Sequence, residues 1–235
     1  FVGGSNVAFG IDSKTISDSI KLPVFNAGLI AGLGMRYIFD SYEPYFRRGD
    51  IVILMPEYDH FYGDNAYGNP ETAGYLPYLS DFKPWLLNDK QLGVVSLGFL
   101  KTTLQIAVKG TYFKLLHAFR PARNVYEYKM SGFNKWGDEV SHRMLPPNIN
   151  NIGAYPIFGD YNASYTQHLL NQVHHLRERG VRVIFFPPIT SKKMVALNHK
   201  QIVKIKRSLA AAGCAYAVSP DSLAYPDNLL YNTTY

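Results

Sequence analysis

The sequence is poor in the features that would assign it to several common classes of protein. Its one cysteine, Cys214, allows no disulfide within the chain and no cysteine-based metal site. Charged residues make up only 18% of the chain, and the 24 basic residues, against 18 acidic ones, are not gathered in one block. No zinc-finger spacing or RNA-binding signature accompanies the net charge of +6, so we expect no nucleic-acid partner.

Targeting signals are also missing from the sequence. No stretch resembles a signal peptide or a membrane span of about 20 apolar residues. The chain begins within an apolar strand at Phe1-Val2, which suggests that an upstream segment is missing. We expect that such a segment could carry a membrane anchor, so membrane association through it stays possible.

Apolar and aromatic residues, in contrast, are plentiful. At 235 residues and 47% hydrophobic content, the chain can bury a full core. Aromatic residues reach 14%, including 18 tyrosines, which argues against disorder. We therefore expect a single domain over residues 1–235, with a large insertion at about 61–161.

Strand and helix patterns alternate along both ends of the chain. The fold class we predict is α/β: a doubly wound parallel sheet of about five strands, in a flavodoxin-like three-layer arrangement. The insertion at about 61–161 is irregular and partly helical. The predicted strands are Phe1-Val2, Val24-Phe25, Ile51–Met55, 181–186 and 214–218, and the predicted helices are Ser13–Ile20, 29–47, 162–179 and 198–212.

Within the insertion, residues 98–119 have the pattern of a basic amphipathic helix. Such a helix can lie on a membrane or bind a partner, but more often it packs on its own domain. The insertion is also rich in aromatic side chains that could form either a wall for sugar rings or part of the core. These are Trp85, Trp136, Tyr62, Tyr67, Tyr75 and Tyr78.

The turn Gly3-Gly4-Ser5-Asn6 follows the first predicted strand. Glycine allows a strand to pass directly into a helix, which places Ser5 at the edge of the sheet. Asn26 and Glu57-Tyr58 also follow predicted strands. Ligands of parallel sheets bind beyond the carboxyl ends of the strands, so we expect these side chains along one edge.

This turn, the Asn26-Ala27-Gly28 that follows the second strand and the Gly49-Asp50 before the third resemble the SGNH hydrolase superfamily. The nearest relatives by this resemblance are SGNH-like proteins of bacterial exopolysaccharide O-acetylation systems. The resemblance implies that Ser5 is the nucleophile and that the backbone N–H groups of Ser5 and Gly28 stabilise an oxyanion. It covers about residues 1–60 and 160–235.

Two positions depart from the pattern of this superfamily. Glu57 and Tyr58 stand where it has an asparagine donor, and Tyr58 or Asn6 could substitute as donor. The Asp-x-x-His of its last motif corresponds to the tail after Asp227, where Asn232 or Asp227 would orient a histidine. Of the histidines present, His60 is the one that follows a strand at the expected edge.

The resemblance implies a serine O-acyl esterase or O-acetyltransferase that acts on cell-surface or exported polysaccharide, or on a small acyl ester. The alternative is a catalytically impaired SGNH-like domain that binds glycan or a partner in a polysaccharide assembly. Both readings imply an extracytoplasmic protein, periplasmic or at the cell surface and possibly anchored to a membrane. Neither calls for a cofactor or a metal ion.

Overall fold

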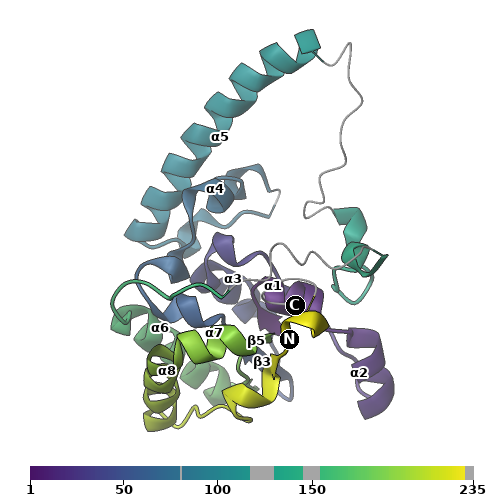
Figure 1. Cartoon of the computed structure of the whole chain (residues 1–235), viewed down its shortest axis with the longest axis vertical. Coiled ribbons are helices and arrows are strands. Elements are labelled where there is room, and N and C mark those ends of the chain that lie inside the picture. Colours follow the sequence, from purple (N-terminus) through teal and green to yellow (C-terminus); the bar gives the residue numbers. More distant parts are fainter. Residues whose placement is uncertain (80, 117–129, 145–153, 231–235) are drawn as a thin grey trace.

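A parallel sheet of four strands forms the centre of the molecule (Figure 1). In the computed structural model, residues 1–79, 81–116, 130–144 and 154–230 are described. The strand order is β2-β1-β3-β4. The strands are β1 (Val2–Gly3), β2 (Ala27–Gly28), β3 (Ile51–Met55) and β4 (Arg182–Phe185).

Strand β3 is apolar on both sides, and its side chains alternate between two hydrophobic clusters. Val52 and Leu54 belong to the larger cluster, which also contains residues of helices α3 (Met35–Tyr42), α6 (Ala163–Glu178) and α8 (His199–Ala211). Ile53 and Met55 contact the smaller cluster, which is formed around Val7 of helix α1 (Ser5–Gly10). Because successive side chains of a strand point to opposite faces, the sheet is covered on both sides.

Most helices lie where the periodicity of apolar residues predicts them. Helix α2 has the predicted bounds, whereas α3 is much shorter than the predicted 29–47 because Gly34 (φ 89°) and Pro44 interrupt the helix on either side. The helices outside the insertion are α1 (Ser5–Gly10), α2 (Ser13–Ile20), α3 (Met35–Tyr42), α6 (Ala163–Glu178), α7 (Lys192–Leu197) and α8 (His199–Ala211).

Two strand predictions need correction. The second strand is Ala27–Gly28 rather than Val24-Phe25, because Ala27 is the residue that pairs with Val2 of β1. The predicted strand 214–218 is reduced to a single parallel bridge between Tyr216 and Phe185. A small parallel sheet that the sequence analysis missed joins β5 (Thr190–Ser191) to β6 (Ala224–Tyr225).

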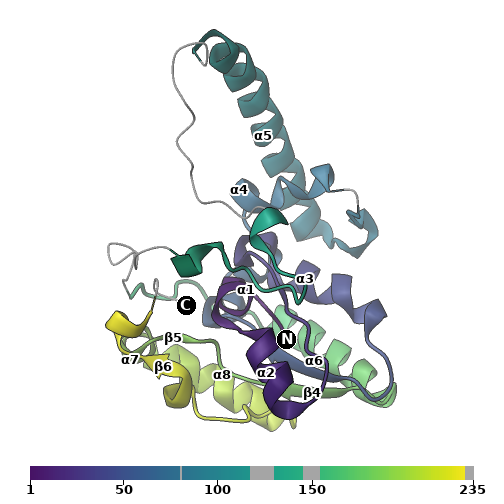
Figure 2. The same ribbon diagram turned by 90° about the vertical axis from the view of Figure 1, so that its right-hand side faces the viewer.

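The insertion contains α4 (Pro70–Ala73) and the long helix α5 (Asp89–Leu116), which projects away from the sheet (Figures 1 and 2). The prediction of a helix over 98–119 started nine residues too late, and 117–119 lie outside the described residues. Within α5, Asp89–Val108 is long and apolar enough to cross a membrane, by length and composition, with a mean hydropathy of 1.3; the sequence analysis did not single out this stretch. Glycine, serine, threonine and glutamine interrupt the apolar residues of this stretch, so it does not stand out in the sequence as a continuous apolar run.

Segment 130–144 of the insertion is fixed beside the sheet by a buried carboxylate, that of Asp138. This carboxylate accepts hydrogen bonds from the Ser13 hydroxyl (2.6 Å) and backbone N–H (3.1 Å), and from the side-chain amides of Asn26 (3.0 Å) and Asn134 (3.1 Å). Four donors therefore converge on one buried group. It holds together the start of α2, the segment before β2 and the insertion.

Replacing Asp138 by alanine should destabilise the fold strongly. The substitution leaves the four donors without their acceptor, so we expect the free energy of unfolding to fall by about 2–4 kcal/mol. Urea denaturation measures this loss. As a control, Asp18→Ala removes an exposed carboxylate paired with Lys14, and should change stability by no more than about 1 kcal/mol. Equal effects of the two substitutions would contradict this role of Asp138.

Candidate active site

The candidate site lies where β1 and β3 end. Gly3, the last residue of β1, is paired with Gly28 of β2 on one side and with Met55 of β3 on the other. The chain then continues into α1, which begins at Ser5, and beyond β3 into Pro56 and Glu57. The register of the sheet thus brings two segments separated by about 50 residues to the same edge.

At this edge, the Ser5 hydroxyl donates a hydrogen bond to Oε1 of Glu57, at 3.2 Å. Ser5 is half-buried and Glu57 is buried. Gly4 makes this approach possible, because a β-carbon at that position would collide with the Glu57 carboxyl group. The glycine before Ser5 is therefore needed for the contact as well as for the turn.

Burial raises the pKa of the Glu57 carboxyl above the usual value for glutamate, and the neighbouring negative charge of Asp59 raises it further. The proximity of His60 and hydrogen bonds from the Ser5 side chain and the Asn6 backbone oppose the shift. A carboxyl group with a raised pKa is a stronger base once it is ionised. Glu57 is therefore suited to accept a proton from Ser5.

His60 follows β3, as expected, but its hydrogen bond is to Glu57 and not to Ser5. It is buried, and its Nδ1 accepts a hydrogen bond from the backbone N–H of Glu57 at 3.1 Å. An imidazole that accepts at Nδ1 carries its proton on Nε2 when it is neutral. His60 therefore helps to fix the turn Tyr58–Phe61 that positions Glu57.

Asn6 is the second unusual residue at this edge. It is completely buried, yet within the described part of the chain neither its amide nitrogen nor its amide oxygen has a hydrogen-bond partner. Leaving such a group unpaired costs about 1–3 kcal/mol, so native proteins rarely do so without a reason. A buried donor next to Ser5 is the kind of group that a bound ligand or a developing oxyanion would satisfy.

The groups expected at the end of β2 have other hydrogen-bond partners. The backbone N–H of Gly28 donates to the Asn26 side-chain oxygen at 2.8 Å. The Asn26 amide nitrogen donates to the carbonyl of Val7 (2.9 Å) and to Asp138. Asn26 thus ties β2 to α1 and to the insertion. Gly28 would have to break its hydrogen bond to serve an oxyanion.

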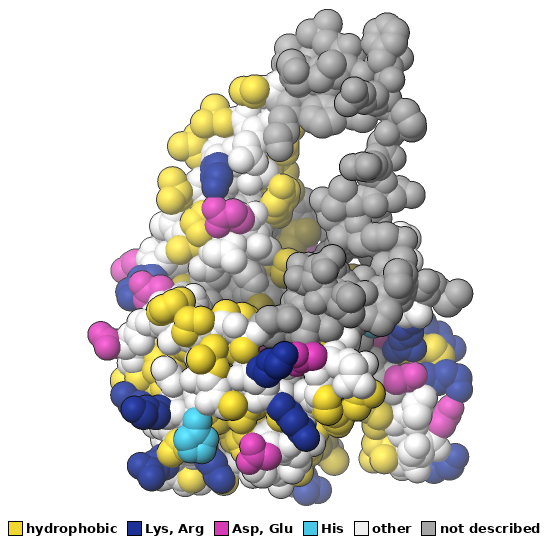
Figure 3. Space-filling model, in the orientation of Figure 1, with side chains coloured by type: hydrophobic (Ala, Val, Ile, Leu, Met, Phe, Trp, Pro, Cys, Tyr) yellow, Lys and Arg dark blue, Asp and Glu magenta, His cyan; other side chains and the backbone are white. Residues whose placement is uncertain are grey.

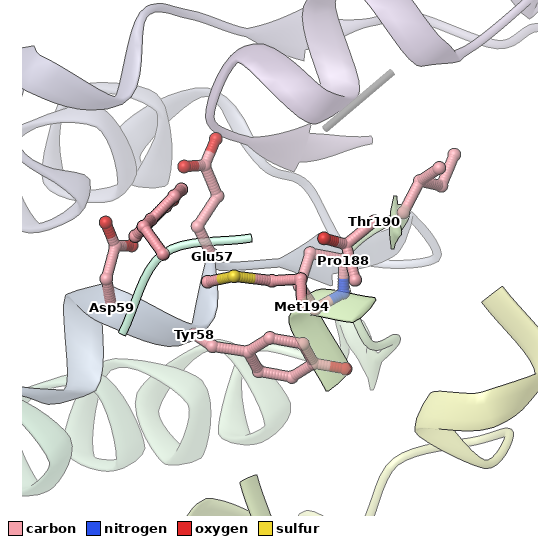
Figure 4. A pocket seen from close by; sticks show the side chains of 8 residues that line it. Glu57, Tyr58, Asp59, Pro188, Thr190 and Met194 are labelled. Atoms are coloured by element: carbon pink, nitrogen blue, oxygen red, sulfur yellow. The ribbon is translucent and has the colours of Figure 1, made fainter. Parts of the chain in front are cut away.

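Tyr58 points away from Glu57 (Figure 4). Its hydroxyl is buried without a hydrogen-bond partner among the described residues, and burial, followed by the nearby Asp221, raises its pKa. A small pocket lies between this turn and the segment after β4. It is lined by Glu57, Tyr58, Asp59, Tyr155, Pro188, Ile189, Thr190 and Met194. The pocket adjoins the turn that carries Glu57.

Of the two residues expected to orient a histidine, only Asp227 falls within the described residues. Asp227 lies in the turn Asp227–Leu229, where its carboxylate forms an ion pair with Lys193 of α7. Asn232 lies outside the described residues. Of the candidate residues, the structure brings together Ser5, Asn6, Glu57 and His60.

One pair of residues near α1 was missed by the sequence analysis. His142 Nδ1 lies 3.1 Å from a carboxylate oxygen of the buried Glu139, and the His142 ring lies 5.1 Å from that of Phe9. Phe9 is one helical turn beyond Ser5 on the same face of α1. A carboxylate-oriented imidazole thus lies near helix α1, which begins at Ser5. The short spacing Glu139-Val140-Ser141-His142 could have signalled it.

Within the residues that the structure describes, no three His, Cys, Asp or Glu side chains gather as metal ligands would. Searches against protein-family models, curated proteins and solved structures found no match to this chain. The resemblance to SGNH hydrolases therefore rests on the motif residues alone.

The raised pKa of Glu57 predicts a specific dependence of stability on pH. The folded state favours the protonated carboxyl, so its contribution to stability is full below the unfolded-state pKa of about 4.3 and is lost as pH rises through the folded-state pKa. Glu57→Gln cannot ionise. The difference in free energy of unfolding between Glu57→Gln and the wild type should therefore shift in favour of the variant as pH rises. Above the folded-state pKa of Glu57, this difference should become constant.

Urea denaturation at a series of pH values measures this difference. Glu178→Gln, which removes an exposed carboxyl group on α6, is the matched control and should show no such gain. A constant difference between Glu57→Gln and the wild type at all pH values would contradict the assigned shift.

Proposed function

We propose that this protein is an SGNH-like serine acyl-transfer enzyme, with Ser5 as nucleophile and Glu57 as its proton acceptor. The observation that carries the proposal is the hydrogen bond from the Ser5 hydroxyl to the buried Glu57 carboxyl. Serine is a weak nucleophile by itself, and an adjacent base is the usual means of activating it.

The position of the pair in the sheet supports this proposal. The strand order β2-β1-β3-β4, continued by the bridge at Tyr216, is the order that a flavodoxin-like, doubly wound sheet would have, and it supports this fold for the chain. In such a sheet the order of strands reverses between β1 and β3, and ligands bind beyond the carboxyl ends at this point. Ser5 follows β1 and Glu57 follows β3, so the pair occupies the expected ligand position.

In the proposed reaction, Glu57 accepts the Ser5 proton as the serine oxygen attacks the ester carbonyl. The tetrahedral intermediate then expels the alcohol, which takes the proton from Glu57, and leaves an acyl group on Ser5. Water or an acceptor hydroxyl attacks this acyl-enzyme while its proton passes to Glu57, and Ser5 is regenerated with that proton. The side-chain amide of Asn6 donates to the oxyanion.

The substrate class follows from the resemblance to exopolysaccharide O-acetylation proteins. We propose O-acyl esters of cell-surface or exported polysaccharide as substrates, and an extracytoplasmic location. Part of the aromatic insertion is available for sugar rings, since Tyr75, Tyr78 and Trp85 are exposed, whereas Tyr62 and Tyr67 are buried. Of the two roles considered for the aromatic residues, the exposure of Trp85 excludes a place in the core for that residue.

The second candidate is a domain of the same type that binds a glycan or a partner without catalysis. Two hydrogen bonds favour this candidate. The Gly28 N–H, expected as an oxyanion donor, is bonded to Asn26. The Ser5 hydroxyl is bonded to a carboxylate instead of an imidazole. Acylation of Ser5 distinguishes the two candidates.

Treatment with p-nitrophenyl acetate should add one acetyl group to the protein, detectable by intact mass, and Ser5→Ala should abolish it. Glu57→Gln should slow the labelling by about 10²- to 10⁴-fold, because the general base is lost. The rate should rise with pH through the raised pKa of Glu57, since only the ionised carboxyl accepts a proton. The exposed Ser19 gives a matched control, and Ser19→Ala should be labelled like the wild type.

The same assay tests the His142 pair as the base. On our proposal His142→Gln is labelled at nearly the wild-type rate. Slow labelling of His142→Gln together with normal labelling of Glu57→Gln would transfer the role of base to His142. The absence of any Ser5 adduct on the folded wild-type protein would favour the binding domain.

Asn6→Leu should separate catalysis from stability. Loss of one oxyanion donor lowers acylation by about 10²- to 10³-fold. Stability should stay the same or increase, because an unpaired buried amide is replaced by an apolar side chain. Labelling rates and urea denaturation of the same preparation measure both effects. A large loss of stability with unchanged labelling would assign Asn6 to the fold alone.

A further inference from the structure

Helix α5 exposes apolar side chains that its own domain does not cover. Its first turns pack on the domain through the buried residues Gln91, Val95, Gly98 and Thr102, which recur at helical spacing. From 103 to 108 every side chain is exposed, and the helix continues away from the sheet (Figures 1 and 2). The exposed large apolar residues of this helix are Leu92, Leu97, Phe99, Leu100, Leu104, Ile106 and Val108.

These side chains surround the helix. Leu92, Phe99 and Ile106 are spaced by seven residues and lie on one side, whereas Leu100 and Leu104, four residues apart, lie on another. Figure 3 shows hydrophobic side chains along both edges of the projecting helix. A helix that is apolar all round is normally buried in a large core or in a membrane.

The length of this helix suits insertion into a bilayer. By length and composition, Asp89–Val108, with 20 residues, could cross a membrane. The domain covers the helix up to Thr102, so residues 103–116, about 21 Å of helix, are left to enter the apolar layer. Between 91 and 108 the sequence has one charged residue, Lys101, and its ammonium group is paired with Glu71 at 2.7 Å.

Aromatic side chains are exposed near the base of the same helix. Tyr75, Tyr78 and Trp85 are at least half exposed. The Tyr78 ring lies 5.2 Å from that of Phe99, and its hydroxyl is 2.8 Å from the Thr103 hydroxyl, so Tyr78 is held against α5. Tyrosine and tryptophan are enriched where membrane proteins cross from the apolar layer to the headgroups.

We propose that the part of α5 beyond Thr102 inserts into a lipid bilayer and holds the domain at the membrane surface, with these aromatic residues at headgroup level. A second copy of the chain would cover one stripe of the helix, as in a coiled coil. The apolar residues form no single stripe, so lipid, which can contact the helix from all sides, is the better-matched occupant. The proposal uses no residue of the Ser5 site and stands independently of the proposed acyl transfer, but it places Tyr75, Tyr78 and Trp85 against lipid headgroups instead of sugar rings.

Flotation of the full chain with vesicles tests the insertion. With vesicles made of equal parts of phosphatidylcholine and phosphatidylglycerol, we expect the wild type to float with the lipid. Leu104→Asp/Val108→Asp should reduce the bound fraction about tenfold or more, because charged side chains are costly within a bilayer. The control Leu22→Asp/Leu197→Asp introduces two aspartates at exposed leucines outside α5 and should float like the wild type.

Fluorescence adds a local readout. The chain has two tryptophans, so Trp136→Phe leaves Trp85 as the single reporter. Its emission should shift to shorter wavelength with vesicles, and the shift should disappear in the Leu104→Asp/Val108→Asp background. Ser5→Ala should float normally, which keeps this test separate from that of the proposed reaction.

Three results would overturn the proposal. The first is a folded wild-type chain that stays with the soluble fraction. The second is equal flotation of the wild type and the Leu104→Asp/Val108→Asp variant. The third is a dimer, found by light scattering, that this variant dissociates while neither protein binds vesicles, since a second copy of the chain would then cover α5.

Discussion

The carboxyl group of Glu57 is buried at the edge of the sheet, and a buried carboxyl must either find donors or stay protonated. Both conditions shape the surroundings. The Ser5 hydroxyl and the Asn6 backbone supply hydrogen bonds, and burial raises the pKa of the group. Gly4 leaves room for the carboxyl beside the turn. The residues that make Ser5 a candidate nucleophile are thus the same residues that make it possible to bury Glu57.

The regular parts of the fold could be predicted from the sequence because they depend on local patterns. The continuous apolar run of β3 and the helical spacing of α2 gave the observed bounds of both elements. The position of Ser5 at the edge of the sheet also followed from the pattern, since parallel strands end at a common edge. The contact between Ser5 and Glu57 could not be predicted, because a side chain that follows a strand can point toward the neighbouring strand end or away from it.

Other features depend on contacts between residues far apart in the chain. Asp138 meets Asn26 across 112 residues, and no local signal links the two positions. Strands β1 and β2 have two residues each, too short for a periodicity to mark their bounds. Helix α5 was expected to pack on its domain, but the structure exposes most of its apolar side chains. Sequence periodicity identifies such a helix without showing what surrounds it.

The pairing of Ser5 with Glu57 can be tested through the pKa of Glu57 in the folded protein. Carbon-detected NMR of the labelled carboxyl group gives this value for the wild type and for Ser5→Ala. We expect a pKa above the usual glutamate value of about 4.3 in the wild type. We expect a still higher pKa in Ser5→Ala, because the lost hydrogen bond stabilised the charged form. An ordinary pKa that does not respond to Ser5→Ala would show that Ser5 and Glu57 do not interact in this way.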